Sequence, residues 1–292
     1  MKLSIIILNY KQQGLVKQCL KGIVTAQPQL DYEIIVVDNN SEDDTLAMVV
    51  SLFEPKDETK SQLALPIVDK LKIPPIKAIQ SGINGGFAAG NNLGIAQAAG
   101  EYIMILNPDI AILPESLERM VEFMDAHKDV GMIGPRLINP DGTVQYSCRR
   151  FPNFITPLLR RTFFGKLPTG KKSVEWYLMK DFDHLSNRQV DWLFGACLLV
   201  RKTLINSIGK FDERFFMYFE DLDLCRRIWQ VGSKVVYFSE VELVHYHQRL
   251  SAERSGVLGI FTKGGRVHLI SGVKYFLKYF GIKLPPTNAG QI

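Results

Sequence analysis

The sequence predicts an α/β fold with a mostly parallel central sheet. Continuous apolar runs, which are typical of strands buried on both faces, occupy residues 3–8, 33–38 and 101–106. Stretches with helical spacing follow these runs, and strands that alternate with helices form parallel sheets with right-handed crossovers. The chain of 292 residues is long enough for one large or two modest domains.

The first half of the chain is expected to hold four strands, each followed by a helix. Ser41 in "SEDDT" is a plausible N-cap for the helix after the second strand. Pro114 suits the first turn of the helix after the fourth strand. The charged, proline-bearing stretch 54–75 is expected to be a surface excursion. The four predicted strands are 3–8, 33–38, 76–79 and 101–106.

The second half is less regular. In "FFMYFEDLDLCRRIWQVG" (215–232), apolar residues fall on one face of a helix that is expected to stop at Gly232. "VDWLFGACLLV" is expected to be a strand or a buried segment, and "KVVYF" and "VELVHYH" two separate strands. After residue 256 the pattern predicts a basic amphipathic helix.

Polar residues follow three of the predicted strands, at the edge where parallel sheets bind ligands. They are Asn9 and Tyr10, then Asp38, then Asn107 and Asp109. A carboxylate such as Asp109, directly past a buried strand, can bind a divalent cation that bridges two phosphates. Asn-Pro-Asp is also a good turn sequence. Asp38 holds the place where a ribose or base is commonly bound, or it is a loop residue.

Two further features suggest a ligand site and also have plainer explanations. "NGGFAAGNNLG" (84–94) would let the backbone approach a phosphate, although a tight strand-to-helix connection explains it equally well and it matches neither GxGxxG nor a Walker sequence. His245 and His247 lie on the same side of a predicted strand and could bind a metal. A lone histidine is more often a structural one.

The acidic cluster of Glu220, Asp221 and Asp223 follows a run of aromatic residues. Carboxylates in the first turn of a helix favour its dipole, which explains one or two of the three. A carboxylate held against apolar surface has its ionised form disfavoured, so its basicity rises. The cluster therefore predicts a general base.

Composition narrows the class of protein. The formal charge of +5 is mild, and the basic, aromatic segment 149–172 carries no recognised nucleic-acid motif, so we expect no nucleic-acid partner. The four widely spaced cysteines fit reduced thiols in a cytosolic protein. The start "MKLSIIILNY" lacks a signal-peptide cleavage site, and the longest apolar run is too short to span a bilayer. We expect a cytoplasmic protein, with peripheral contact to the inner face of the cytoplasmic membrane as a further hypothesis.

Together these motifs resemble the family 2 glycosyltransferases, a large group with the GT-A (Rossmann-like) fold, which binds nucleotide diphosphate-sugars. The likeness covers residues 3–247 and is closest to rhamnosyltransferase-like enzymes that build bacterial surface polysaccharides. It predicts a GT-A domain over 1–250, with a nucleotide-sugar-binding half (1–110) and an acceptor-binding half (111–250), and a helical extension over 251–292. The motifs that carry it are "SIIILNY", "IIVVDNNSEDDT", "NGGFAAGNNLGI", "YIMILNPDI", "GACLLVRK", "FDERFFMYFEDLDLCRRI" and "LVHYH".

The resemblance implies a role for each matching residue. Asp221 matches the general base, with Glu220 and Asp223 as neighbours in the same motif. Asp109 matches a ligand of Mg²⁺ or Mn²⁺, and His245 a histidine that completes the metal site in some members, with His247 as the alternative. The implied nucleotide-binding residues are Asn9, Tyr10, Asp38, Asn84, Gly86 and Asn107, and the implied acceptor-binding residues are Trp192, Phe216 and Tyr218.

The implied reaction is inverting transfer of a sugar from a nucleotide diphosphate-sugar to a hydroxyl of a saccharide or lipid-linked acceptor. dTDP-L-rhamnose is the expected donor, and a UDP-hexose is the alternative. A non-catalytic nucleotide- or membrane-binding module is a rival from another class. A glycoside hydrolase also uses two carboxylates, but the single acidic cluster and the nucleotide-type strand ends argue against it.

Overall fold

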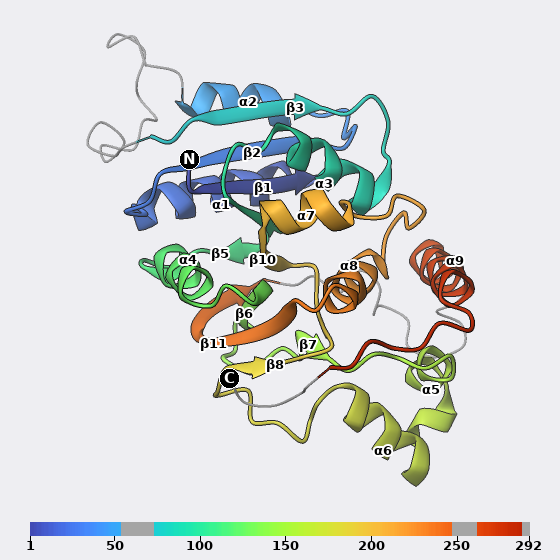
Figure 1. Ribbon diagram of the computed structural model, residues 1–292. Coiled ribbons are helices and arrows are strands. Elements are labelled where there is room, and N and C mark those ends of the chain that lie inside the picture. The colour runs from blue at the N-terminus through green and yellow to red at the C-terminus, as the bar shows by residue number, and fades with distance from the viewer. Residues whose placement is uncertain (54–72, 247–261, 288–292) are drawn as a thin grey trace, which may run out of the picture.

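The computed structural model describes residues 1–53, 73–246 and 262–287. The central sheet has nine strands, in the order β3-β2-β1-β4-β10-β6-β11-β5, with β8 paired to β11 outside this path (Figure 1). A separate two-stranded sheet joins β7 and β9. The strands are β1 (Leu3–Asn9), β2 (Tyr32–Asp38), β3 (Ile76–Gln80), β4 (Tyr102–Leu106), β5 (Ile110–Ala111), β6 (Val130–Ile138), β7 (Cys148–Arg149), β8 (Arg188–Gln189), β9 (Trp192–Leu193), β10 (Cys197–Arg201) and β11 (Lys234–His245).

Strand directions confirm the predicted α/β fold. β3, β2, β1 and β4 are parallel neighbours, and β6 and β11 form a second parallel pair. Between these two groups runs β10, which is antiparallel to both β4 and β6. Cys197 pairs with Leu106, so β10 begins at the edge where β4 ends. The apolar runs predicted as strands in the first half are all strands of this sheet.

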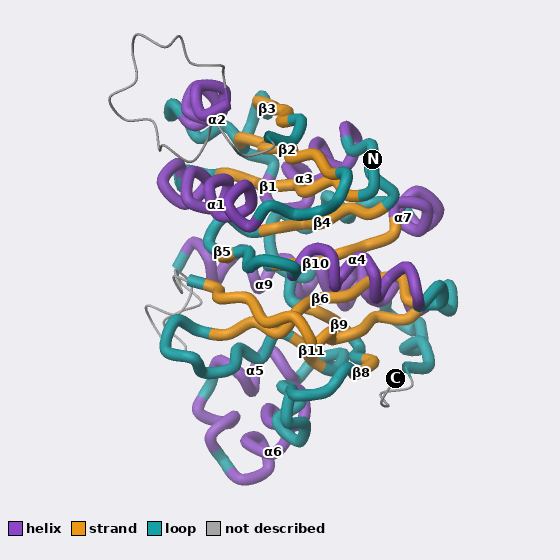
Figure 2. The backbone as a smooth tube through the Cα atoms, turned by 90° about the vertical axis from the view of Figure 1, so that its left-hand side faces the viewer, coloured by secondary structure: helices purple, strands orange, loops and turns teal. Residues whose placement is uncertain are grey.

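Helices cover both faces of the sheet. α1, α2 and α4 pack on one face, and Figure 2 shows α1 and α4 in front of the strands. α3, α7, α8 and α9 contribute buried side chains to the core on the other face. The helices are α1 (Gln13–Ala26), α2 (Thr45–Phe53), α3 (Gly86–Gln97), α4 (Ser116–Ala126), α5 (Thr156–Arg161), the 3₁₀ helix η2 (Phe163–Lys166), α6 (Pro168–Tyr177), α7 (Lys202–Ile208), α8 (Glu220–Gln230) and α9 (Lys263–Lys278).

Two local predictions were wrong. The segment expected to hold two strands is the single strand β11, which pairs with β6 along its length. Its register against β6 shifts between Phe238 and Glu242, where the two strands were expected to separate. Ser41 is not the N-cap of α2, because its buried hydroxyl accepts hydrogen bonds from Asn9 Nδ2 and from the Lys11 backbone. The Thr45 backbone N–H instead donates to Asp43 Oδ1, at 3.0 Å.

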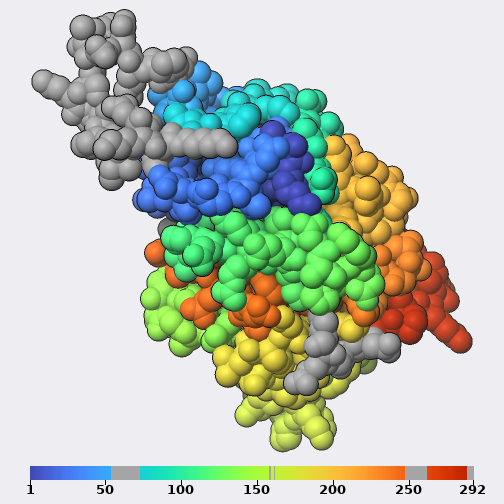
Figure 3. Space-filling model, turned by 60° about the vertical axis from the view of Figure 1, so that its left-hand side comes forward, coloured from blue at the N-terminus to red at the C-terminus, as the bar shows by residue number. Residues whose placement is uncertain are grey.

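The predicted C-terminal helix is present as α9 and packs on the fold. Tyr275 and Tyr279 belong to the same core as α8. The α5–α6 segment projects at the lower end of the molecule (Figure 3). No helix in the described ranges is both long and apolar enough to cross a bilayer. The domain boundary at residue 250 stays a prediction, because residues 247–261 lie outside the described residues. Most of the stretch 54–75, expected to be a surface excursion, also lies outside them.

Candidate active site

The ends of β1 and β2 are joined by a buried hydrogen-bond network. Asn9 Nδ2 donates to Asp38 Oδ1 at 2.7 Å and also lies within hydrogen-bond distance of Ser41 Oγ and Thr45 Oγ1. Asp38 Oδ2 accepts from the Ser41 backbone. Asn9 therefore holds Asp38 in place at the strand end. Tyr10, the next residue, is 43% exposed, so its ring is open to a ligand.

The glycine-rich turn is fastened to the segment before the acidic cluster. Phe87 N donates to the Phe216 carbonyl at 2.7 Å, and Gly86 has a φ of +85°. A Cβ on Gly86 would lie 2.0 Å from that carbonyl oxygen, so only glycine permits this approach. Asn39 Nδ2 donates to Asn84 Oδ1 and to the Gly86 carbonyl. Asn84 and Gly86 thus shape the turn, and their contact with a nucleotide stays a prediction.

The structure brings Asp109 and His245 together, as the sequence predicted. His245 pairs with Ile110 across β11 and β5, and Tyr246 N donates to the Asp109 carbonyl. This pairing sets Asp109 Oδ1 3.2 Å from His245 Nε2. Asn107, in the same loop, is fixed through its backbone N–H to the Ala196 carbonyl. His247, the alternative ligand, lies outside the described residues.

A residue that the sequence did not reveal, Gln145, sets the orientation of His245. Gln145 Nε2 donates to Asn139 Oδ1 and to the His245 carbonyl, which leaves Gln145 Oε1 to accept from His245 Nδ1 at 2.8 Å. In a neutral ring, Nε2 then carries a lone pair that faces Asp109 Oδ1. Two acceptors at this separation suit a shared cation.

The donor set fits a divalent cation that needs further ligands from its substrate. Asp109 Oδ1 is buried and has no hydrogen-bond partner among the described residues. The described residues contain no cluster of three His, Cys, Asp or Glu side chains around one point. Phosphate oxygens and water would therefore complete the coordination shell, an arrangement that Mg²⁺ commonly adopts.

Asp221 lies at the start of α8, where its carboxylate is held by backbone donors. Its Oδ2 accepts from Gly195 N at 2.9 Å and its Oδ1 from Leu222 N at 2.8 Å. Burial raises the pKa of Asp221, and the two backbone N–H groups and the charge of Arg149 oppose that rise. Gly195, which the sequence did not single out, is thus the residue that orients the predicted base.

Glu220 is buried like Asp221 but lacks the hydrogen-bond donors that hold the Asp221 carboxylate. Burial first, and the neighbouring Asp221 charge second, hold the pKa of Glu220 well above its usual range. Its Oε2 is buried without a hydrogen-bond partner among the described residues. Burial disfavours the ionised form of both carboxyl groups. The backbone N–H groups of Gly195 and Leu222 favour the charge on Asp221, whereas Glu220 Oε2 has no such donor among the described residues.

Glu220→Gln should remove a pH dependence of stability. Folded Glu220 keeps a proton that the unfolded chain releases above its ordinary pKa of 4.5, so the free energy of unfolding falls as the pH rises from there toward the raised pKa. The Gln variant lacks this loss, so its stability relative to the wild type should increase with pH. Urea denaturation at about pH 5 and about pH 8 measures it.

The exposed Glu122 on α4 offers the control, since Glu122→Gln should leave the pH dependence unchanged. A Glu220→Gln variant less stable than the wild type by the same amount at both pH values would mean that Glu220 is ionised in the fold.

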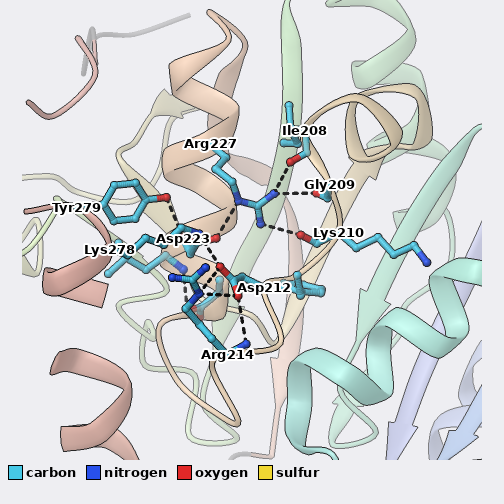
Figure 4. Close-up of polar contacts among 12 residues, drawn as sticks. Ile208, Gly209, Lys210, Asp212, Arg214, Asp223, Arg227, Lys278 and Tyr279 are labelled. Carbon is cyan, nitrogen blue, oxygen red and sulfur yellow. Dashed lines mark hydrogen bonds and ion pairs between the residues drawn. The ribbon is translucent and has the colours of Figure 1, made fainter. Parts of the chain in front are cut away.

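The Asp223 side chain makes no hydrogen bond with the groups that hold Asp221; its contacts are with α8 and the end of α9. Its side chain is 0% exposed, and it accepts hydrogen bonds from Arg227 Nε, Lys278 Nζ and Tyr279 Oη (Figure 4). Lys278 and Tyr279 lie at the end of α9, so Asp223 fastens the C-terminal helix to α8. Asp223 lies two residues from the predicted base, as expected, but these three hydrogen bonds hold helices together and leave its oxygens occupied.

The three predicted acceptor residues differ in accessibility. Phe216 is 38% exposed, whereas Trp192 is only 6% exposed and its Nε1 donates to the Arg150 carbonyl. The Tyr218 ring lies against His268, with centroids 5.1 Å apart. Of the three, Phe216 offers the most open ring to a sugar. Their role in acceptor binding stays a prediction.

Comparison with known proteins agrees with the strand-end geometry. The family model for glycosyl transferase family 2 matches residues 4–186, more than half of the chain. The N-acetylglucosaminyl-diphospho-decaprenol L-rhamnosyltransferase of Mycobacterium tuberculosis is 31% identical over 188 residues, which span 60% of each chain. The rhamnosyltransferase WbbL of Escherichia coli K12 is 28% identical over 207 residues, 66% of this chain and 70% of WbbL.

Solved structures show the same fold. The S. aureus TarS fragment 1–349 in complex with UDP aligns with a TM-score of 0.52 and 20% identity, over 84% of this chain and 60% of that one. GalNAc-T7 with UDP, GalNAc and Mn²⁺ aligns with a TM-score of 0.59 and 12% identity, over 85% of this chain and 44% of that one. These neighbours are GT-A glycosyltransferases, which confirms the predicted fold. The chain belongs to the family 2 glycosyltransferases, with rhamnosyltransferases among its relatives.

Proposed function

We propose that the protein is an inverting glycosyltransferase that moves L-rhamnose from dTDP-L-rhamnose to a hydroxyl of a saccharide or lipid-linked acceptor in bacterial surface polysaccharide synthesis. The observation that carries this proposal is the Asp221 carboxylate at the start of α8, which two backbone N–H groups hold beside Glu220, a carboxyl group whose pKa is raised by burial. The names of the M. tuberculosis and E. coli relatives favour rhamnose. A UDP-hexose donor is the alternative, favoured by TarS, which was solved with UDP-GlcNAc.

In this mechanism Asp221 accepts the proton of the acceptor hydroxyl as the oxygen attacks the anomeric carbon. The bond from that carbon to the diphosphate breaks on the opposite face, so the configuration inverts. Asp109 and His245 would hold a divalent cation, Mg²⁺ or Mn²⁺, which supplies positive charge to the departing diphosphate. Burial raises the pKa of Glu220, which disfavours a second negative charge beside Asp221.

The direct test is nucleotide binding followed by turnover. We expect dTDP to raise the melting temperature more than UDP or GDP, and more in the presence of Mn²⁺, because a ligand that binds only the folded state stabilises it. A larger shift with UDP would favour the UDP-hexose alternative. Nucleotide binding without any transfer to saccharide or lipid-linked acceptors would instead favour a non-catalytic module.

Gln145→Ala should weaken metal binding although Gln145 touches no metal. Loss of the partner that orients a histidine ligand commonly lowers metal affinity about 10–100-fold. Asp109→Asn should lower it at least as much. Mn²⁺ binding followed by electron paramagnetic resonance measures the affinity without turnover. Asp183→Asn, at an exposed position outside this hydrogen-bond network, is the matched control. Unchanged Mn²⁺ affinity in both site variants would place the metal elsewhere.

A peripheral membrane contact is part of the proposal. α5 and α9 lie side by side in both Figure 1 and Figure 2. α9 carries basic residues and no acidic residue. Basic and apolar side chains together favour an anionic bilayer surface. Exposed apolar side chains occur in and beside α5, η2, α6 and α9: they include Phe154, Phe163, Phe164, Trp176, Leu269, Leu277 and Phe280.

Replacing both Phe163 and Phe164 with serine should weaken sedimentation with phosphatidylglycerol vesicles by about tenfold, because two exposed aromatic rings are lost. The same pair of variants should not change nucleotide binding. Val231→Ser, which alters an exposed apolar residue at the end of α8, is the control. Equal sedimentation of all variants would exclude this face as the contact.

A further inference from the structure

Arg149 occupies an aromatic box beside the candidate active site. Its Cζ lies 5.0 Å from the ring centroid of Trp192, 5.7 Å from that of Phe194 and 5.9 Å from that of Tyr177. The pairing of β7 with β9, which sets Arg149 opposite Trp192, fixes this position. Three rings therefore hold the guanidinium in a defined place, where cation–π attraction stabilises its charge.

The guanidinium of Arg149 forms no salt bridge with a carboxylate of the described residues. A long hydrogen bond, 3.4 Å, joins its Nε to the Tyr146 carbonyl. Its neighbour Arg150 differs, because two of its nitrogens bind the two oxygens of Asp181. Arg150 therefore forms an ion pair within the fold, whereas the terminal nitrogens of Arg149 remain available for an anion.

The position of Arg149 links the two halves of the candidate site. The Phe194 ring, which Arg149 approaches, lies 6.4 Å from the His245 ring. The next residue, Gly195, donates its N–H to Asp221. Arg149 is also close enough to Asp221 for its charge to lower the pKa of that carboxyl. The guanidinium thus lies near both the predicted base and the predicted metal ligands.

We propose that Arg149 binds a phosphate or diphosphate ester in the active site. This inference rests on the proposed function and adds a residue to it. Planar guanidinium groups match phosphate oxygens in pairs, and a partly desolvated one binds them strongly. The phosphate has two possible sources: the diphosphate of the donor, or a diphosphate that joins the acceptor sugar to a lipid.

Binding measurements on the full chain separate these sources. Arg149→Met removes the charge and keeps an apolar side chain in the box, and Arg149→Lys keeps a charge without the planar fork. The probes are dTDP or UDP, whichever the wild type binds, then pyrophosphate, and then farnesyl diphosphate in the presence of that nucleotide at saturation, all with Mn²⁺ and followed by calorimetry. Arg119→Met, which removes an exposed arginine of α4, is the control.

We expect Arg149→Met to lower the affinity for a phosphate probe about 10–100-fold, with part of the affinity restored in Arg149→Lys. Weaker binding of nucleotide and pyrophosphate would identify the donor diphosphate. Weaker binding of farnesyl diphosphate alone would identify the acceptor.

If Arg149→Met bound all three probes as tightly as the wild type, the inference would be wrong. A lowered melting temperature with unchanged affinities would mean that Arg149 only stabilises the fold by packing. Those outcomes leave the proposed function intact. If the wild-type protein bound neither nucleotide, the proposed function itself would fail, and the inference with it.

Discussion

Asp221→Asn should lower the turnover rate about 10²–10⁴-fold while nucleotide affinity stays at the wild-type level. The amide retains the shape of the carboxylate and its single oxygen can still accept one of the two backbone N–H groups, from Gly195 or from Leu222, but it cannot take a proton from the acceptor hydroxyl. An interaction that acts only in the transition state changes kcat and leaves ground-state binding alone. Steady-state transfer rates and nucleotide calorimetry on the same preparation measure both quantities.

A control for the stability of Asp221→Asn is the same substitution at another buried carboxyl group, Asp191. Asp191 also has a pKa raised by burial and accepts a backbone N–H, from Phe151. Asp191→Asn reports what an amide at such a position does to stability. If Asp221→Asn kept more than a tenth of the wild-type rate, the base would have to be sought elsewhere; if it lost nucleotide binding as well, the site would have been distorted.

Asp223→Ala should lower the free energy of unfolding by about 3–5 kcal/mol, the loss expected when one partner of a buried ion pair is removed. Asp223 is fully buried, and its removal leaves Arg227 Nε and Lys278 Nζ facing each other without the carboxylate between them. Tyr279 loses a partner as well. Urea denaturation measures the loss, and limited proteolysis should show α9 released first.

Asp212 provides a matched comparison, because it shares Lys278 but its side chain is 19% exposed. Asp212→Ala should lower stability by only about 1 kcal/mol or less, since exposed ion pairs contribute little. Equal losses for the two variants would mean that burial does not set the strength of this network. Unchanged turnover in the folded fraction of Asp223→Ala would further separate Asp223 from the chemistry.

Local pattern was sufficient for the strands of the first half, and it directed attention to Asp109, His245 and Asp221, whose roles stay predictions. Strands buried on both faces show as continuous apolar runs, and their ends mark the ligand edge. β11 was misjudged because "SE" (239–240), where the pairing slips, looks like a break between strands. Gln145 was missed because its partner His245 is 100 positions away and no periodicity records such a contact.

Asp223 shows that the role of a side chain can also depend on a contact distant in sequence. The sequence places it two residues from Asp221, and only the position of α9, 55 residues further on, shows that its oxygens are used for packing. Ser41 was misassigned for a related reason: an isolated serine before a helix suggests a cap, but the long-range contact with Asn9 takes its hydroxyl.

The reversed direction of β10 has a consequence for how such a protein can diversify. Because β10 starts where β4 ends, the loop that precedes it meets the loops that follow the parallel strands at one edge. Gly195 and Ala196, in this loop, touch Asp221 and Asn107 through backbone atoms alone. These two contacts depend on the main-chain path of the loop, whose own side chains are fixed because Ala196 is buried and Phe194 packs against Arg149. Diversification is therefore expected in the more exposed loops around this edge, which can change without moving the main chain that holds Asp221 and Asn107.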